Sequence, residues 1–90
     1  MQTVQAGTLE SMDCLVTLTE AEKGRGVSVS MEGSSVTRFG DAILRATKET
    51  LKKMGARDVT ASIQDNGASD LVLRARVEAA ALRLKAGAAQ

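Results

Sequence analysis

Alternation of apolar and polar residues marks two strands in the first third of the chain. Residues 12–20 and residues 27–32 each place an apolar side chain at every second position. A period of two is typical of a strand with one buried face. A short connection with two glycines separates the segments, so the pattern predicts an antiparallel hairpin. The residues expected on its buried face are Cys14, Val16, Leu18, Val27, Val29 and Met31.

From residue 36 the apolar positions follow the helical period instead. Lys52 and Lys53 stand in the expected last turn, where positive charge suits the helix dipole, and Gly55 follows as a terminator. The pattern therefore predicts a helix over residues 36–54. The side chains expected to face the core are Val36, Phe39, Ile43, Ala46 or Thr47, Leu51 and Met54.

The last third of the chain holds a strand and then a segment with two interpretations. Residues 57–65 alternate, with Val59, Ala61 and Ile63 on one face, and the Asn66-Gly67 pair that follows marks a turn. Beyond the turn, residues 70–76 alternate as a further strand would. Residues 69–85 also show helical spacing, a capping serine and many helix-forming Ala, Leu and Arg residues. We favour a helix that ends near Gly87 and keep the strand as the alternative.

These elements predict an α+β fold, a small two-layer sandwich with the order β-β-α-β-α, in which an antiparallel hairpin packs with two helices. Residues 1–11 are small and polar and are expected to form a flexible arm. Residues 12–86 would form the single α+β domain, and residues 87–90 a frayed tail.

The composition excludes several classes of function. The 90 residues carry a net charge of +1 and include no histidine, one cysteine and one aromatic residue. Without histidine the usual base near neutral pH is missing, and a zinc site is not expected. The charge balance and the lack of aromatic residues argue against nucleic-acid binding, and no apolar run is long enough for a membrane span. We therefore expect no catalysis and no metal. With no signal-peptide pattern in residues 1–10 and no disulfide, a cytoplasmic location is expected.

Ser11 is the residue with the clearest chemical potential. It stands where the expected arm meets the first strand, so an enzyme that modifies hydroxyl groups can reach it. Asp13 follows two residues later, and its carboxylate could orient the hydroxyl or hold Mg²⁺ for a transfer enzyme. On this spacing alone, a plain polar serine before a strand is the simpler interpretation.

Four sequence blocks change that balance: AGTLESMD at residues 6–13, FGDAI at 39–43, DNGA at 65–68 and LRARVEA at 73–79. Together they resemble the citrate lyase acyl carrier protein, the gamma subunit of that complex. The resemblance implies that Ser11 carries 2'-(5''-phosphoribosyl)-3'-dephospho-CoA through a phosphodiester. It implies that Glu10 and Asp13 shape recognition by the prosthetic-group transferase. Some members have a second serine where this chain has Met12, and this chain has a shorter C-terminal end.

The resemblance also implies partners and a mechanism. The carrier would hold acetyl and citryl thioesters for an alpha subunit, the acyl transferase, and a beta subunit, the acyl lyase, and citrate would be cleaved to acetate and oxaloacetate. The carrier itself would be non-catalytic. Carriers of malonate decarboxylase, which also have a Ser-x-Asp site, and of citramalate lyase remain alternatives, as does an unmodified assembly module.

Three further residues have two interpretations each. Arg74 and Arg76 would bind phosphates of the prosthetic group or a partner subunit; the alternative is a solvated helix face in which Arg74 pairs with Glu78. Cys14 lies close to Ser11 but has no neighbouring histidine to activate it, so a core cysteine is favoured over an acyl-carrying thiol.

Overall fold

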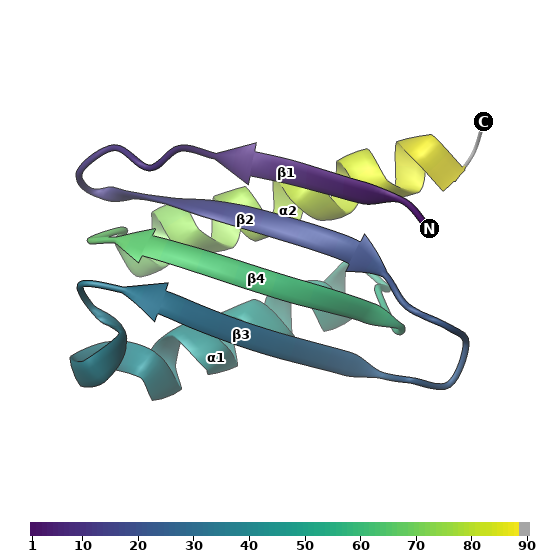
Figure 1. Cartoon of the computed structure of the whole chain (residues 1–90), viewed down its shortest axis with the longest axis horizontal. Coiled ribbons are helices and arrows are strands. Elements are labelled where there is room, and N and C mark those ends of the chain that lie inside the picture. The colour runs from purple at the N-terminus through teal and green to yellow at the C-terminus, as the bar shows by residue number, and fades with distance from the viewer. Residues whose placement is uncertain (89–90) are drawn as a thin grey trace.

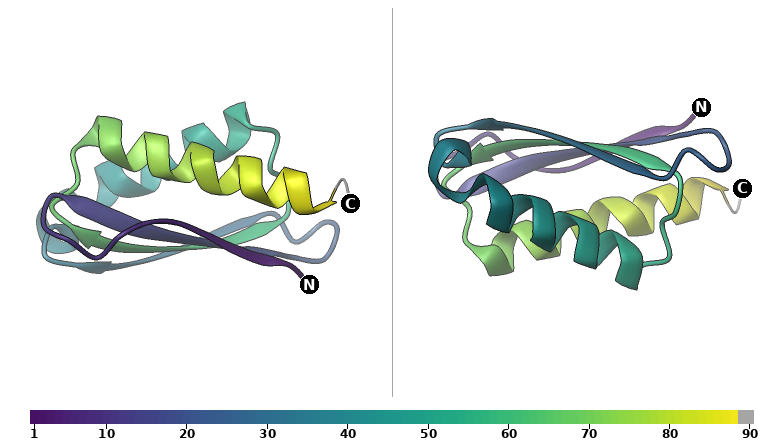
Figure 2. Two further views of the ribbon diagram at one scale, coloured as in Figure 1. Left: turned by 90° about the horizontal axis from the view of Figure 1, so that it is seen from above. Right: turned by 90° about the horizontal axis from the view of Figure 1, so that it is seen from below.

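The computed structural model describes residues 1–88. A four-stranded sheet carries both helices on one of its faces (Figures 1 and 2), as the predicted α+β sandwich requires. The elements, in chain order, are β1 (Thr3–Gly7), β2 (Asp13–Glu20), β3 (Val27–Gly33), α1 (Val36–Lys53), β4 (Val59–Asn66) and α2 (Asp70–Ala88).

The strand order is β1-β2-β4-β3, so the hairpin predicted between residues 12–20 and 27–32 is wrong. The hairpin of this fold is β1–β2, and β4 lies between β2 and β3, antiparallel to β2 and parallel to β3. The β2–β3 connection instead crosses the start of β4. There the Asp58 carboxylate accepts hydrogen bonds from the N–H groups of Gly24 and Gly26, at 3.0 and 2.8 Å. A crossover helix such as α1 is what two parallel neighbours require.

The prediction of a flexible arm over residues 1–11 is wrong for residues 3–7, which form the edge strand β1. Each of its residues pairs with β2, from Thr3 opposite Thr19 to Gly7 opposite Leu15. The sequence did not indicate this strand because β1 is largely polar. The polar side chains on its outer face lie beside polar side chains of β2. Gln5, for example, donates a side-chain hydrogen bond to the Thr17 hydroxyl at 3.1 Å.

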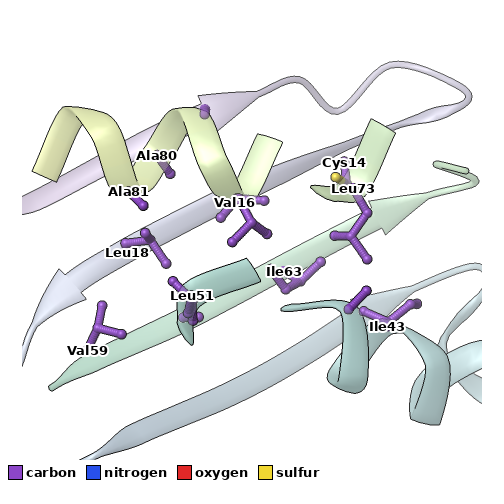
Figure 3. Packing of buried hydrophobic residues seen from close by; sticks show 14 residues of the cluster. Cys14, Val16, Leu18, Ile43, Leu51, Val59, Ile63, Leu73, Ala80 and Ala81 are labelled. Atoms are coloured by element: carbon purple, nitrogen blue, oxygen red, sulfur yellow. The ribbon is translucent and has the colours of Figure 1, made fainter. Parts of the chain in front are cut away.

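The core lies between the sheet and the helices (Figure 3) and contains the residues that the alternation predicted on β2 and β4. Phe39, which helical spacing placed among the core-facing residues of α1, is instead 51% exposed. The backbone leaves helical geometry at this residue, with φ −122° and ψ 15°, and the kinked first turn of α1 leaves the aromatic ring at the surface. The fully buried side chains include Cys14, Val16, Leu18, Leu51, Val59, Ile63 and Val77.

The segment after the Asn66-Gly67 turn is a helix, and the alternative strand over residues 70–76 is wrong. The Ser69 hydroxyl accepts the N–H of Val72 at 3.2 Å and so caps α2. Leu73, Val77, Ala80 and Ala81 then face the core. Of the predicted frayed tail, Gly87 and Ala88 belong to α2, and residues 89–90 lie outside the described residues.

Over residues 1–88, neither helix is both long and apolar enough to cross a membrane. The same residues contain no cluster of three or more His, Cys, Asp or Glu side chains that could hold a metal ion.

Candidate modification site in the β1–β2 loop

Ser11 lies in the loop of residues 8–12 that joins β1 to β2. Figure 1 shows this loop at the end of the domain where β3 and β4 end and where both helices begin. Ser11 is exposed. The nucleophilic oxygen that the sequence singled out is therefore open to an approaching enzyme.

A tight turn presents this serine. The N–H of Asp13 donates to the carbonyl of Glu10 at 3.2 Å, so Ser11 and Met12 occupy the two central positions. Met12 has a φ of +65°, a left-handed conformation that costs a residue with a side chain about 1–2 kcal/mol. Its N–H donates to the carbonyl of Asn66 on β4 at 2.7 Å, which holds the turn in this conformation.

A second hydrogen bond holds the loop to β4, three residues before Met12. The side-chain amide of Asn66 donates to the carbonyl of Leu9 at 3.1 Å. The sequence pattern places Asn66 only in a turn before α2. The strong Asn-Gly signal located that turn, but nothing local to it shows that the amide would reach the loop of Ser11, more than fifty residues away.

Asp13 is buried beneath the loop, with 12% of its side chain exposed. Its carboxylate accepts two hydrogen bonds from the Arg76 guanidinium, at 2.9 and 2.8 Å. It accepts two more, from the Thr8 hydroxyl at 2.7 Å and from the N–H of Cys14 at 2.8 Å. The Arg76 guanidinium, followed by the Thr8 hydroxyl, holds the pKa of Asp13 well below its usual range. The hydrogen bonds of the Asp13 carboxylate thus hold the loop in place.

The arginines have different partners. Arg76 faces the sheet and forms this ion pair with Asp13. Arg74 faces the other way: its guanidinium lies 2.8 Å from the carboxylate of Asp70, one turn earlier on α2, and 3.1 Å from that of Glu49 on α1. These two acidic neighbours raise the pKa of Arg74. Glu78, the partner that helical spacing suggested for Arg74, lies 4.0 Å from Lys53 instead.

The structure thus brings Glu10, Ser11, Asp13 and Arg76 together and places Arg74 elsewhere. Glu10 is exposed, and its N–H donates to the Thr8 hydroxyl at 3.1 Å. The pairing of Asp13 with Arg76 could not be read from the sequence, because the residues are sixty-three positions apart. It arises because α2 packs across β1 and β2.

Cys14 is a core residue, as favoured from the sequence. It has no exposed surface. Burial, followed by the negative charges of Asp13 and Asp65, raises the pKa of its thiol to about 11. A neutral, covered thiol is a poor nucleophile, so Cys14 is not suited to carrying an acyl group.

The loop supplies an exposed hydroxyl and no histidine base. The carboxylate nearest in sequence on the β2 side is bound to Arg76, and the chain has no histidine. Such a site is suited to being modified by another enzyme, with the base supplied by that enzyme.

Comparison with known proteins gives an independent view of this domain. Residues 1–84 match the family model described as malonate decarboxylase delta subunit (MdcD). The chain is 40% identical over 78 residues to the citrate lyase acyl carrier protein of Clostridium perfringens, covering 87% of this chain and 76% of that protein. It is 41% identical to citrate lyase acyl carrier protein 2 of Salmonella typhimurium and 42% identical to the citrate lyase acyl carrier protein of Escherichia fergusonii, in each case covering 87% of this chain and 79% of the relative. The chain therefore belongs to the family of acyl carrier proteins that contains these citrate lyase and malonate decarboxylase subunits.

Proposed function

We propose that this protein is the acyl carrier subunit of a citrate lyase, with 2'-(5''-phosphoribosyl)-3'-dephospho-CoA bound covalently to Ser11. The observation that supports this most is the exposure of the Ser11 hydroxyl at the tip of a loop that is otherwise tightly hydrogen bonded. The citrate lyase names of the relatives favour this lyase over others.

The residues around Ser11 fit such a group. A phosphodiester needs an accessible oxygen and open space beyond it, and the neighbouring residues Glu10 and Met12 are both exposed. When bound, the group supplies a thiol that holds acyl chains as thioesters. Ser11 contributes the oxygen to which the group is joined. Thr8, Asp13 and Arg76 contribute indirectly, by holding the turn in place.

Because the loop is ordered, the movement of the acyl group between partner subunits must have another source than the protein chain. From the sequence, residues 1–11 were expected to form a flexible arm, and such an arm would let the acyl group swing between subunits. Because β1 and the loop are held to β2 and β4, the reach must be supplied by the prosthetic group itself. Tethering still raises the local concentration of the acyl group at its partner sites.

The proposal includes specific partners and a location. They are an alpha subunit that transfers acyl groups, a beta subunit that cleaves the citryl group, and the transferase that modifies Ser11, all in the cytoplasm. The carrier contributes no catalytic residue. A second function, carrier subunit of a malonate decarboxylase, is favoured by the family model that matches residues 1–84.

The test is the intact mass of the protein made in cells that contain the prosthetic-group enzymes. We expect an added phosphoribosyl-dephospho-CoA on the peptide that contains Ser11, and no addition in Ser11→Ala. Ser34→Ala is the matched control, since Ser34 is also exposed and lies at the same end of the domain. It should be modified like the unchanged protein.

The lyase itself is distinguished by reconstitution. The modified protein should restore citrate cleavage to purified alpha and beta subunits of citrate lyase, and Ser11→Ala should not. Cleavage restored by Ser11→Ala would indicate an unmodified assembly module instead. Modification at Ser11 with activity restored only to malonate decarboxylase or citramalate lyase subunits would support a carrier and reject the citrate lyase assignment.

A further inference from the structure

Large apolar side chains are exposed around Ser11. In the part of the chain that the structure describes, six large hydrophobic residues are at least half exposed. Four of them lie at the end of the domain that carries Ser11, and we call this set the apolar end face. Its members, with their exposed fractions, are Leu9 (61%), Met12 (75%), Phe39 (51%) and Leu71 (78%).

The apolar end face comes from separate parts of the chain that the fold brings together. Leu9 and Met12 belong to the loop of Ser11, Phe39 to the first turn of α1 and Leu71 to the first turn of α2. The segment between β4 and α2 connects them. It is bonded to Met12 through Asn66, and a side chain at Gly67 would lie 3.8 Å from the Met12 backbone.

The same segment forms one wall of a hollow between the two helices. The hollow has a volume of about 250 Å³ and is mainly apolar. Ala68 lines it from the segment after β4, Leu73 from α2, and Phe39, Ala42 and Ile43 from α1. Phe39 therefore stands at the edge of a recess that a partner's side chain can enter.

Irregular backbone supports this exposure at two points. Met12 adopts a left-handed conformation and remains three-quarters exposed, so the conformation gains no burial for its side chain. The kink in α1 falls at Phe39 itself. Strained or irregular backbone that presents apolar side chains to solvent is a feature of recognition surfaces.

We propose that the apolar end face is the surface on which the transferase that modifies Ser11 docks. This inference rests on the proposed function, because it takes Ser11 as the modified residue. The transferase must bring a base and an activated precursor to a hydroxyl that lies inside the apolar end face. A specific interface covers about 800 Å² on each partner. That area is far larger than a five-residue loop, and it extends over the starts of both helices.

The two exposed leucines of α2 provide a matched test. Leu71 is in the apolar end face, whereas Leu82 is 53% exposed near the other end of the same helix. We would measure modification of the unmodified protein by purified transferase and the activated precursor of the group, following intact mass over time. Leu71→Ala should raise the KM for the carrier about fivefold or more, with kcat unchanged, as expected for an exposed anchor in an interface.

Phe39→Ala should behave like Leu71→Ala, and Leu82→Ala should stay within about twofold of the unchanged protein. Far-UV circular dichroism checks that each variant is folded. Leu71 makes the decisive variant, because it is 78% exposed and its truncation removes little packing.

The outcomes separate the two proposals. If the unchanged protein is not modified at Ser11, the proposed function fails and this inference fails with it. If it is modified, but Leu71→Ala and Phe39→Ala match Leu82→Ala, only the docking surface is rejected. Normal modification together with lost binding to the lyase subunits would also reject it, since the apolar end face would then serve those subunits instead.

Discussion

Replacement of Gly7 by alanine tests whether the loop of Ser11 depends on close backbone packing at its base. Gly7 is the last residue of β1, with a φ of +97°. A Cβ atom at this position would collide with the carbonyl oxygen of Cys14 and would lie 3.2 Å from Cδ of Arg76. Gly24 is a matched control, with a φ of +91° and no atom within 4 Å of the added Cβ.

Both substitutions place alanine at a positive φ, and only Gly7→Ala adds a steric clash. Alanine in this backbone region costs about 1–2 kcal/mol, partly offset by about 0.4–1 kcal/mol from the less flexible unfolded chain. Gly24→Ala should therefore lower the free energy of unfolding by about 1 kcal/mol. Gly7→Ala must also displace the Cys14 carbonyl, which accepts the N–H of Thr8 at 3.2 Å. That adds about 1 kcal/mol for the hydrogen bond and about 1–3 kcal/mol for overpacking.

Urea unfolding followed by far-UV circular dichroism measures the difference, since the chain lacks Trp and Tyr for fluorescence. A domain of this size loses about 1 kcal/mol of stability per molar urea. The midpoint of Gly7→Ala should thus fall about 2 M or more below that of Gly24→Ala. Equal midpoints for the two variants would refute the close packing between Gly7 and Cys14.

Two further predictions concern ionisable groups beneath the loop. The lowered pKa of Asp13 means that its ion pair stabilises the fold fully above the unfolded value of about 4, and that this contribution is lost as the pH falls toward the folded value. Asp13→Asn should therefore be less stable at pH 7 and should show a flatter fall in melting temperature between pH 4 and pH 2; a parallel fall would contradict the ion pair. The thiol of Cys14 should react slowly with iodoacetamide at pH 8 in the folded protein and rapidly in 8 M urea, because burial raises its pKa to about 11 and covers it. Fast labelling of the folded protein would show that it is accessible.

Prediction from sequence succeeded for elements whose own residues show a clear periodicity of apolar positions. The alternation in β2 and β4 identified Val16, Leu18 and Ile63 as core residues, and helical spacing identified α1 and α2. It failed at β1, whose outer face is polar, and at Phe39, where a kink overrides the helical period. Strand pairing was wrong for a different reason. Chain proximity favoured the hairpin of residues 12–20 with 27–32, and β4 inserts between them.

The sequence by itself determined the fold class and the absence of a histidine base, and it singled out Ser11 as the candidate site, because composition and short motifs are local properties of the chain. Only the tertiary structure decided that the loop of Ser11 is held in place. The contacts that hold it, from Arg76 to Asp13 and from Asn66 to Leu9, join positions more than fifty residues apart. They form because α2 packs across the sheet and β4 lies beside β2. A local pattern carries no information about such pairs, and the docking of the elements creates them.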